Sequence, residues 1–398
     1  MNYPVLYLRK GAERRLRSGH VWVYSNEVDS RRSPLAEFEP GSQAQLLASN
    51  DKPLGTVFVN PKTLICGRLI SRDPTQGMTA QRLTQRLEAA LVLRQRLFPE
   101  PYYRWVFGDS DGLSGLVVDR FGDVVVVQIS TAGMELLKDA VVNGIKRLVQ
   151  PTSIILKNDG KMRQVEGLDS YVTVAAGPDV SQLALVENGV RFEAPLQDGQ
   201  KTGWFYDHRM NRRRLMDYTA GKRVLDVFSY VGGWGLQAAV AGASQVTCLD
   251  ASATALGAVQ HNARLNGLSN VDTLQGDAFE ALKALCDDKA RYDIVVLDPP
   301  ALIPRRRDQK AGEQAYARLN QLGMRLLERD GVLVSASCSM HLGQDRLIDI
   351  IRSSGRKVDR FVQLLEQGHQ APDHPVIPGI PETDYIKACF VRSLTGFY

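Results

Sequence analysis

The sequence is poor in cysteine, and its few thiols stand alone. The five are Cys66, Cys248, Cys286, Cys338 and Cys389. They are odd in number and form no Cys-x-x-Cys pair, whereas a disulfide framework or a structural zinc site needs cysteines at paired, short spacings. The pattern argues against both, predicts no metal site and indicates a reducing compartment.

Long hydrophobic runs are missing as well. No stretch reaches the ~18 apolar residues that a membrane-spanning helix needs. The short apolar run between Tyr3-Pro4 and Arg9-Lys10 does not make a signal peptide. We therefore expect a cytoplasmic protein without a membrane partner.

What is present describes a globular chain with a mild positive charge. Its 398 residues predict two or three domains of ~100–200 residues each, and the formal net charge is +5. Residues 1–73 hold 11 Lys/Arg against 7 Asp/Glu, clustered in part at Arg14-Arg15-Leu16-Arg17. Clustered positive charge neutralises phosphates, so this region is compatible with a nucleic-acid partner. The alternative interpretation of the positive charge is a soluble enzyme that simply has more basic than acidic residues.

The sequence divides into three regions that differ in their patterns of predicted strands and helices. Residues 1–75 hold short apolar strands separated by glycines, which predicts a compact β-barrel. Residues 76–196 combine helical patterns over 76–98 and 132–149 with hairpin signals, which predicts a small α+β middle domain. Residues 197–398 alternate helices with Val-rich strands, which predicts an α/β, Rossmann-like domain whose mostly parallel, seven-stranded sheet is covered on both faces.

The strongest local signal is the run from Val224 to Gly235, in which a buried strand enters a glycine-rich turn before a helix. The Gly-x-Gly-x-x-Gly fingerprint, with which NAD enzymes hold a pyrophosphate, is absent. S-adenosylmethionine (AdoMet) has no phosphate, and Asp226 followed by a looser turn suits its aminocarboxypropyl group. Acids also follow the next two strands: Asp250 is placed for the ribose hydroxyls and Asp277 for the adenine amine.

Each acid alone is more often a helix N-cap, but three at consecutive strand ends favour AdoMet binding. The predicted cofactor-binding residues are Asp226, Phe228, Ser229, Tyr230, Gly232, Gly233, Asp250, Ala251, Asp277, Ala278 and Asp298.

The fourth strand ends in Asp298-Pro299-Pro300-Ala301. Two prolines make a rigid loop, and the acid is able to accept a hydrogen bond from a target base. The alternative is that Pro-Pro only ends the strand. Enzymes that methylate exocyclic amines often carry an aromatic residue next, and Ala301 therefore argues against amine chemistry.

Cys338 follows the fifth strand, in Ser337-Cys338-Ser339. This position places the thiol at the carboxyl end of the sheet, where it faces the crevice of the cofactor. Carbon 5 of a pyrimidine is a poor nucleophile, and a thiolate that adds to carbon 6 activates it. We predict that Cys338 and Asp298 are catalytic. The alternative, a buried structural cysteine, is the usual interpretation of a lone thiol.

Basic and aromatic residues mark possible RNA contacts, because stacked bases and phosphates require both. The segments that contain these residues are interpreted equally well as loops whose basic side chains are exposed to solvent. The predicted RNA-binding residues are Arg14, Arg15, Lys201, Arg209, Pro299, Pro300, Arg305 and Arg306.

Taken together, these motifs resemble the RlmI-type 23S rRNA methyltransferases, which form 5-methylcytosine. The similarity includes Leu225–Tyr230, Asp298-Pro299-Pro300 and Ser337-Cys338-Ser339, and the stretch Gly19–Tyr24 resembles the family's RNA-binding PUA domain. It covers nearly the whole chain. The resemblance implies AdoMet as cofactor, 23S rRNA as partner, Cys338 as nucleophile and Asp298 in contact with the cytosine.

Three functions are compatible with the sequence. The leading hypothesis is an AdoMet-dependent rRNA (cytosine-5)-methyltransferase with a role in ribosome biogenesis. The alternatives are an RNA base-amine methyltransferase and a non-catalytic RNA-binding assembly factor. The sequence does not distinguish a monomer from a homodimer, and it does not identify the base that removes the carbon-5 proton.

Overall fold

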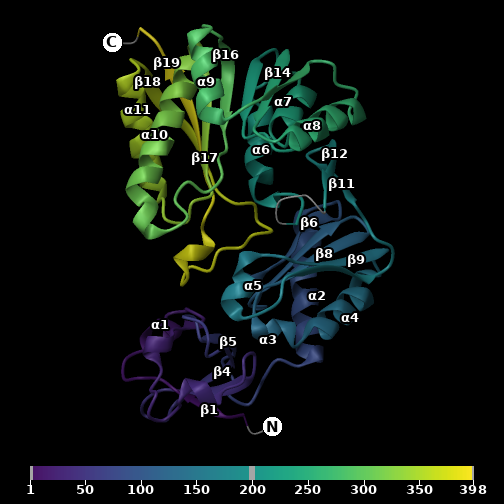
Figure 1. Cartoon of the computed structure of the whole chain (residues 1–398), viewed down its shortest axis with the longest axis vertical. Helices are drawn as coiled ribbons and strands as arrows, with labels where there is room; N and C mark the ends of the chain where they lie inside the picture. The colour runs from purple at the N-terminus through teal and green to yellow at the C-terminus, as the bar shows by residue number, and fades with distance from the viewer. Residues whose placement is uncertain (1–2, 197–201, 397–398) are drawn as a thin grey trace. The chain divides into compact units, whose positions relative to one another are not determined.

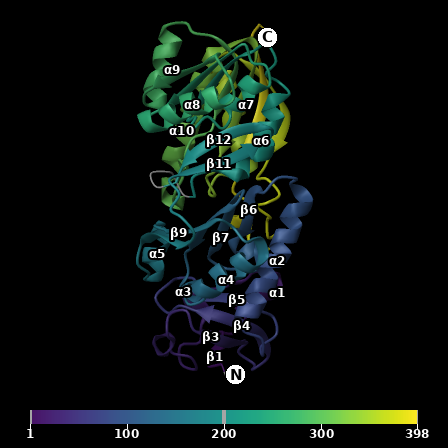
Figure 2. The ribbon, with the colours of Figure 1, turned by 90° about the vertical axis from the view of Figure 1, so that its right-hand side faces the viewer.

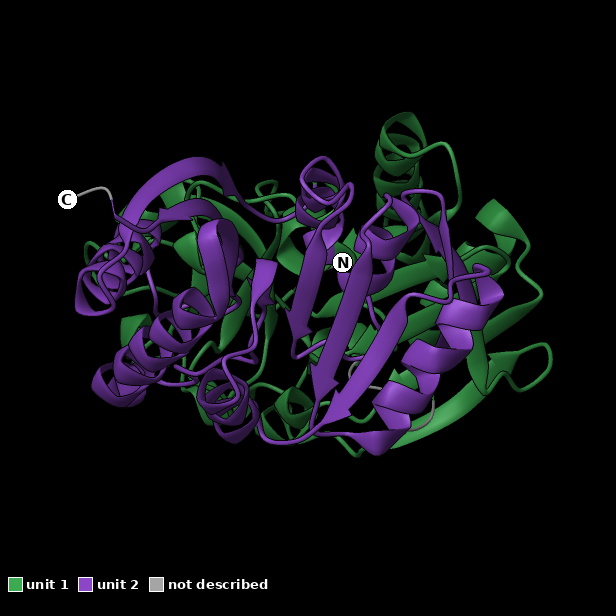
Figure 3. Cartoon of the chain, turned by 90° about the horizontal axis from the view of Figure 1, so that it is seen from above, with its two compact units in different colours: residues 1–183, 195–206, 372–383 green, residues 184–194, 207–371, 384–398 purple. Residues whose placement is uncertain are grey.

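The computed structural model describes residues 3–196 and 202–396 of the chain. The chain divides into two compact units, which Figure 3 colours separately. Unit 1 consists of residues 1–183, 195–206 and 372–383, and unit 2 consists of residues 184–194, 207–371 and 384–398. Each unit therefore gathers three segments that are separated in the sequence.

The N-terminal sheet of unit 1 has five strands in the order β1-β3-β4-β5-β2. They are β1 (Val5–Tyr7), β2 (Trp22–Val23), β3 (Gln43–Leu47), β4 (Pro53–Val59) and β5 (Gly67–Ser71), and helix α1 (Glu13–Arg17) lies between the first two in the chain. β3 buries every second side chain, as a strand with one face on a core does. The strands occur where the glycine spacing predicts them.

The second sheet of unit 1 has the order β10-β9-β8-β7-β6. Its strands are β6 (Tyr102–Phe107), β7 (Leu116–Phe121), β8 (Val124–Ile129), β9 (Ser153–Asn158) and β10 (Tyr171–Ala176). The helices are α2 (Ala80–Leu97), α3 (Ala132–Glu135), α4 (Lys138–Val149) and α5 (Lys161–Glu166). β8 and β9 are parallel, and α3 and α4 connect them. The apolar positions that predict one helix over 132–149 are divided between two, because the backbone at Leu137 leaves the helical region.

One hydrophobic cluster joins the two sheets of unit 1. Phe58 and Ile70 of the N-terminal sheet pack in the same core as Leu87 of α2 and Trp105 of β6. A shared core resists relative motion, so the two sheets form one compact body.

The sheet of unit 2 has seven strands in the order β15-β14-β13-β16-β17-β19-β18. They are β13 (Arg223–Val227), β14 (Gln245–Asp250), β15 (Val271–Gln275), β16 (Tyr292–Leu297), β17 (Leu327–Ser337), β18 (Phe361–Gly368) and β19 (Lys387–Leu394). The first five in spatial order are parallel, and β19 is antiparallel to both of its neighbours. The predicted mostly parallel, seven-stranded sheet is therefore confirmed.

Helices cover both faces of this sheet (Figure 1). They are α6 (Arg209–Met216), α7 (Gly235–Val240), α8 (Ala253–Leu265), α9 (Ala278–Asp287), α10 (Gln309–Leu326) and α11 (Gln344–Lys357). α7 packs on α6 and α8, whereas α10 packs on α9 and α11. The hairpin β11 (Gln182–Glu187) and β12 (Val190–Pro195) lies beside α6 in two views (Figure 1 and Figure 2). No described helix has the length and apolar character that a membrane crossing requires.

The strand order reverses at β13, which has β14 on one side and β16 on the other. In an open parallel sheet, the loops that follow the two strands at such a reversal separate and leave a crevice at their carboxyl ends. We therefore expect a ligand site at the loops after β13, β14, β16 and β17.

Candidate active site

The loop between β13 and α7 has a strained backbone. Phe228 has a φ of 65° and Tyr230 a φ of 49°, both in the left-handed region that residues with side chains rarely adopt. At Gly235, a Cβ would lie 2.7 Å from Cys248 Sγ and 3.1 Å from Asp226 Oδ2, so the turn has no room for a larger residue. Strain of this kind persists where surrounding structure enforces it, and it is often found at ligand sites.

Asp226 is the buried acid beneath this loop. Its Oδ2 accepts a hydrogen bond from the Gly235 N–H at 2.8 Å, but its Oδ1 has no hydrogen-bond partner among the described residues. Burial, with a smaller contribution from the nearby charges of Asp298 and Asp250, raises the pKa of Asp226 to about 7. A buried carboxylate oxygen without a partner is a position for a ligand's donor.

The other two predicted acids are held by backbone groups. Asp250, at the end of β14, accepts from the Tyr230 N–H and from the Ser252 N–H, each at 2.9 Å. Asp277 caps α9, where its Oδ1 accepts from the first-turn N–H groups of Phe279 and Glu280. Asp250 thus belongs to the same loop cluster as Asp226, whereas Asp277 has the capping role that the sequence left open.

The remaining predicted cofactor residues lie along the same loops. Ser229, Gly232 and Gly233 are buried and follow β13, and Gly232 has a φ of 91° that favours glycine. Ala251 is exposed after β14, and Ala278 is buried in the first turn of α9.

Asp298, directly after β16, is held from two sides. The Trp234 indole N–H donates to its Oδ2 at 2.9 Å, and His208 Nε2 lies 3.4 Å from its Oδ1. The rings of His208 and Trp234 are in contact, with centroids 5.3 Å apart. The carboxylate is therefore fixed in position before any substrate binds.

The partners of His208 determine which ring nitrogen carries the proton. Asn211 Nδ2 donates to the carbonyl of His369 at 3.1 Å, and this bond fixes the orientation of the amide. The same Nδ2 lies 3.1 Å from His208 Nδ1, which must then accept. The proton of the neutral ring is therefore on Nε2 and faces Asp298. Nε2 makes no hydrogen bond among the described residues, but because it carries the proton and Nδ1 accepts from Asn211, neither nitrogen has a lone pair available to act as a base.

Cys338 follows β17 and is half-buried. Its Sγ lies 3.8 Å from the carbonyl oxygen of Pro299, which brings the thiol to the Asp298-Pro299-Pro300 loop. The Tyr316 hydroxyl bonds Ser337 Oγ at 2.8 Å and Ser339 Oγ at 2.9 Å, and so holds the residues on both sides of the thiol. Pro299 is buried and Pro300 is exposed.

The other thiols are unsuited to nucleophilic chemistry. Burial raises the pKa of Cys66 to about 12, that of Cys389 to about 11, and that of Cys248 well above its usual value. Burial also raises the pKa of Cys286, which is half-buried on α9. Raised thiol pKa values mean that little thiolate is present near neutral pH.

The predicted RNA-binding residues occupy different surroundings. Arg14, Arg305 and Arg306 are exposed, whereas Arg15 is half-buried and paired with Glu27 at 2.7 Å. Arg209 is buried, with its Nε 3.6 Å from Glu187, so the structure places this side chain in an internal ion-pair cluster rather than on the surface. Lys201 lies outside the described residues.

The predicted site residues do not include His208, Trp234 or Lys387, although all three lie around the predicted site. Each is separated from its partner by many residues, so only the fold brings them together. No group of His, Cys, Asp and Glu suited to a metal ion occurs in the described segments.

Comparison with known families gives two matches. The model of the S-adenosylmethionine-dependent methyltransferase family matches residues 160–384. That of the PUA-like domain matches residues 6–72.

Individual proteins match over nearly the full length. The chain is 33% identical to the ribosomal RNA large subunit methyltransferase I of Klebsiella pneumoniae (strain 342), over 98% of each chain. It is also 33% identical to the protein of that name from Cronobacter sakazakii, over 97% of this chain and 99% of the other. A solved structure named SMU.776, complexed with SAH, superposes with a TM-score of 0.84 at 22% identity, over 98% of this chain and 100% of the other.

Proposed function

This chain belongs to the ribosomal RNA large subunit methyltransferase I family of S-adenosylmethionine-dependent methyltransferases, and we propose that it methylates carbon 5 of a cytosine in 23S rRNA. The predicted fold is confirmed: a class I methyltransferase sheet with an N-terminal PUA-like domain. The predicted cofactor, AdoMet, is confirmed with it.

The loops at the carboxyl ends of β13 and β14 suit AdoMet. Asp226 Oδ1 is a buried acceptor without a partner in the described chain, which suits the cofactor's ammonium group. Phe228, Tyr230 and Gly232 hold the turn open by their positive φ angles, and Asp250 lies beside them for the ribose hydroxyls. When bound, AdoMet would supply the methyl group and would leave as S-adenosylhomocysteine.

The reaction begins with Cys338. Its thiolate sulfur forms a bond to carbon 6 of the cytosine, which gives carbon 5 the electron density to attack the methyl group. The carbon-5 proton then leaves to a base, the electron pair re-forms the 5,6 double bond, and the bond from sulfur to carbon 6 breaks. Cys338 is regenerated.

Asp298 orients the base. Trp234 and His208 hold its carboxylate, and an oxygen of this group accepts from the exocyclic amine of the cytosine. The proton on His208 Nε2 faces Asp298, so His208 fixes this acid and does not take the carbon-5 proton.

The basic segments hold the RNA. We assign RNA binding to residues 1–75, a connecting role to residues 76–196 and catalysis to residues 197–398. Exposed Arg14, Arg305 and Arg306 contact phosphates, and a base inside an RNA helix must be flipped out of its stack at a cost of a few kcal/mol. The protein acts in the cytoplasm, as a monomer or a homodimer.

One observation carries the proposal. Cys338 is half-buried, and its Sγ lies 3.8 Å from the Pro299 carbonyl oxygen at the carboxyl edge of the sheet, whereas Cys66, Cys248 and Cys389 are buried and Cys286 lies on α9. A thiol beside the Asp298-Pro299-Pro300 loop is what carbon-5 chemistry requires and what amine methylation does not use.

The test identifies the product. Purified protein incubated with radiolabelled AdoMet and unmodified 23S rRNA should place the label in 5-methylcytosine, as found by digestion to nucleosides and chromatography. Fully modified 23S rRNA is the control and should accept no label. Label in a methylated exocyclic amine would contradict the proposal and support the base-amine alternative. No label in any RNA, despite cofactor binding, would support the assembly-factor alternative.

AdoMet affinity should depend on pH through Asp226. The pKa of about 7 in the free protein means that the ionised fraction rises from about a tenth at pH 6 to about a half at pH 7. Because a cationic ammonium group binds the ionised form, we expect binding about fivefold tighter at pH 7 than at pH 6, with proton release. Isothermal titration calorimetry in buffers of different ionisation enthalpy measures both quantities.

The raised pKa also has a consequence for stability. Between about pH 4 and pH 7 the folded free protein keeps a proton that the unfolded chain has lost, so Asp226 makes the free protein less stable as pH rises. Asp226→Asn should remove this pH dependence and should also weaken AdoMet binding. Equal affinity of the wild type at pH 6 and pH 7 would contradict the role given to Asp226.

A further inference from the structure

Lys387, the first residue of β19, is a buried cation. Only 6% of its surface is exposed. Its Nζ donates to the backbone carbonyls of Ser339, at 3.1 Å, and of Tyr385, at 3.2 Å. It makes no ion pair within the part of the chain that the structure describes.

Such a position is unfavourable for an ammonium group. Burial lowers the pKa of Lys387, and only the charges of Asp384 and Cys338 raise it. Arg212, another buried cation of unit 2, has a bidentate carboxylate partner in Glu187. A buried charge without a paired counter-ion is costly, and it often marks a functional group.

The sheet places this charge at the proposed nucleophile. Lys387 is opposite Ser337 in the register of β17 and β19, and its Nζ bonds the carbonyl of Ser339. The ammonium group is therefore hydrogen-bonded to the segment that contains Cys338. The side chains of Lys387 and Cys338 interact electrostatically. When the thiol ionises, the thiolate supplies the counter-charge that Lys387 lacks.

We propose that Lys387 stabilises the thiolate of Cys338 and is a positioning residue for the nucleophile. The inference rests on the proposed role of Cys338. An ammonium group beside a thiol favours the ionised form by Coulomb attraction, and the thiol proton passes to water. Tyr316 complements this arrangement: its hydroxyl holds Ser337 and Ser339 in place but carries no charge.

The test measures how readily Cys338 ionises, independently of methylation. Full-length protein is treated with iodoacetamide over a range of pH, and mass spectrometry of the Cys338 peptide gives the alkylation rate. Lys387→Gln retains a donor for the Ser339 carbonyl but removes the charge. We expect the midpoint of its pH–rate profile to rise by about one pH unit or more. Lys387→Arg retains the charge and should keep the wild-type midpoint.

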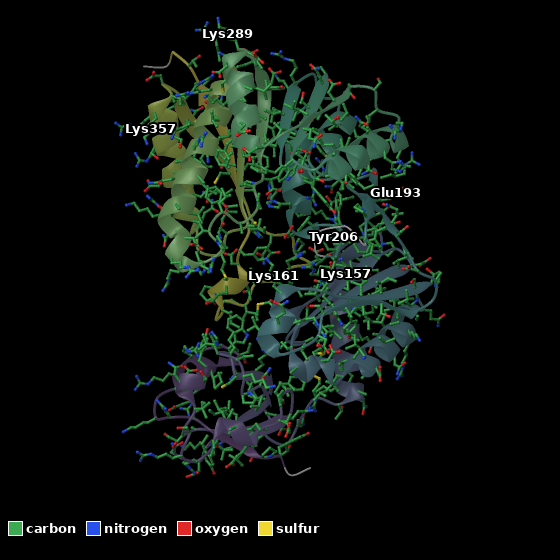
Figure 4. The ribbon with its side chains drawn as sticks, in the orientation of Figure 1. Lys157, Lys161, Glu193, Tyr206, Lys289 and Lys357 are labelled. Atoms are coloured by element: carbon green, nitrogen blue, oxygen red, sulfur yellow. The ribbon has the colours of Figure 1, made fainter. Side chains whose placement is uncertain are left out.

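Lys357→Met is the matched control, because this lysine is exposed at the end of α11, as Figure 4 shows. Its midpoint should equal that of the wild type. AdoMet affinity, measured for each variant, establishes that the protein is folded. Equal midpoints for Lys387→Gln and the wild type would overturn the inference, and so would equal shifts for Lys387→Gln and Lys387→Arg.

The inference and the proposed function fail in different ways. If 5-methylcytosine forms and requires Cys338, but Lys387→Gln leaves the alkylation midpoint unchanged, only the role of Lys387 is wrong. If the midpoint shifts but the wild type forms no 5-methylcytosine, the thiolate contact stands and the proposed function is wrong.

Discussion

Replacement of Cys338 by alanine should abolish methyl transfer to cytosine while AdoMet affinity stays at the wild-type value. Without the sulfur, carbon 5 has no means of gaining electron density. Removal of a covalent nucleophile typically lowers kcat by about 10³–10⁶-fold. Cys338→Ser should be nearly as inactive, because a hydroxyl ionises far less readily than a thiol. Single-turnover assays with excess enzyme measure this loss, and calorimetry measures cofactor binding.

Cys286→Ala is the matched control for this experiment. Cys286 is the other half-buried thiol, but it lies late in α9 with its Sγ beside the Leu322 carbonyl, so its loss should leave turnover unchanged. RNA that carries 5-fluorocytosine gives a second measurement. Carbon 5 then has no proton to lose, so the wild type should accumulate a covalent RNA adduct that Cys338→Ala does not form. An active alanine variant would rule out the thiolate mechanism.

The general architecture of unit 2 could be predicted from the sequence because its signals are local. Val-rich runs such as Asp293–Leu297 form strands that are buried on both faces. They differ from the surrounding helices both in amino-acid composition and in the spacing of their apolar residues. Asp226 and Asp250 lie at or near the carboxyl ends of their strands and Asp298 directly follows its strand, and parallel strands bring these ends to one edge. The strand positions therefore predicted the place of these three acids, whereas Asp277, which the same reasoning added to the group, caps α9.

Contacts between distant segments could not be predicted in this way. His208 and Trp234 hold Asp298 only because the segment before α6, the loop after β13 and the end of β16 meet in the fold. Lys387 reaches the Cys338 segment through an antiparallel pairing whose register the sequence does not encode locally. Strands β6, β10 and β12 were also not predicted, because polar residues interrupt the apolar run of each.

Arg209 illustrates the same limit for charged residues. A basic run before a catalytic domain has the composition of an RNA-binding segment, yet Arg209 and Arg212 are buried because β11 places Glu187 opposite them. The acid that neutralises them is on another element, so composition alone does not distinguish a surface patch from an internal ion-pair cluster.

The same cluster gives the largest expected effect on stability. Glu187 is fully buried, and its carboxylate accepts from Arg212 at 2.6 and 3.1 Å and from Gln237 at 2.9 Å. Glu187→Gln would remove the buried carboxylate that pairs with both the Arg209 and the Arg212 guanidinium groups. Breaking a buried pair from one side typically costs about 3–5 kcal/mol of the free energy of unfolding. Differential scanning calorimetry of the full chain measures the loss as a lower transition temperature, and the transition of unit 2 is recognised by its rise when AdoMet binds.

Glu193→Gln is the control, because this acid lies on the next strand of the same hairpin (Figure 4) and pairs with His261 at 2.8 Å in a partly exposed position. Exposed pairs contribute about 0–1 kcal/mol, so the control should change the transition little. Replacement of Arg212 by Gln together with Glu187→Gln should recover part of the loss, since one of the two buried cations that pair with Glu187 is then removed. A Glu187→Gln variant as stable as Glu193→Gln would mean that water or a rearranged side chain compensates the two arginines.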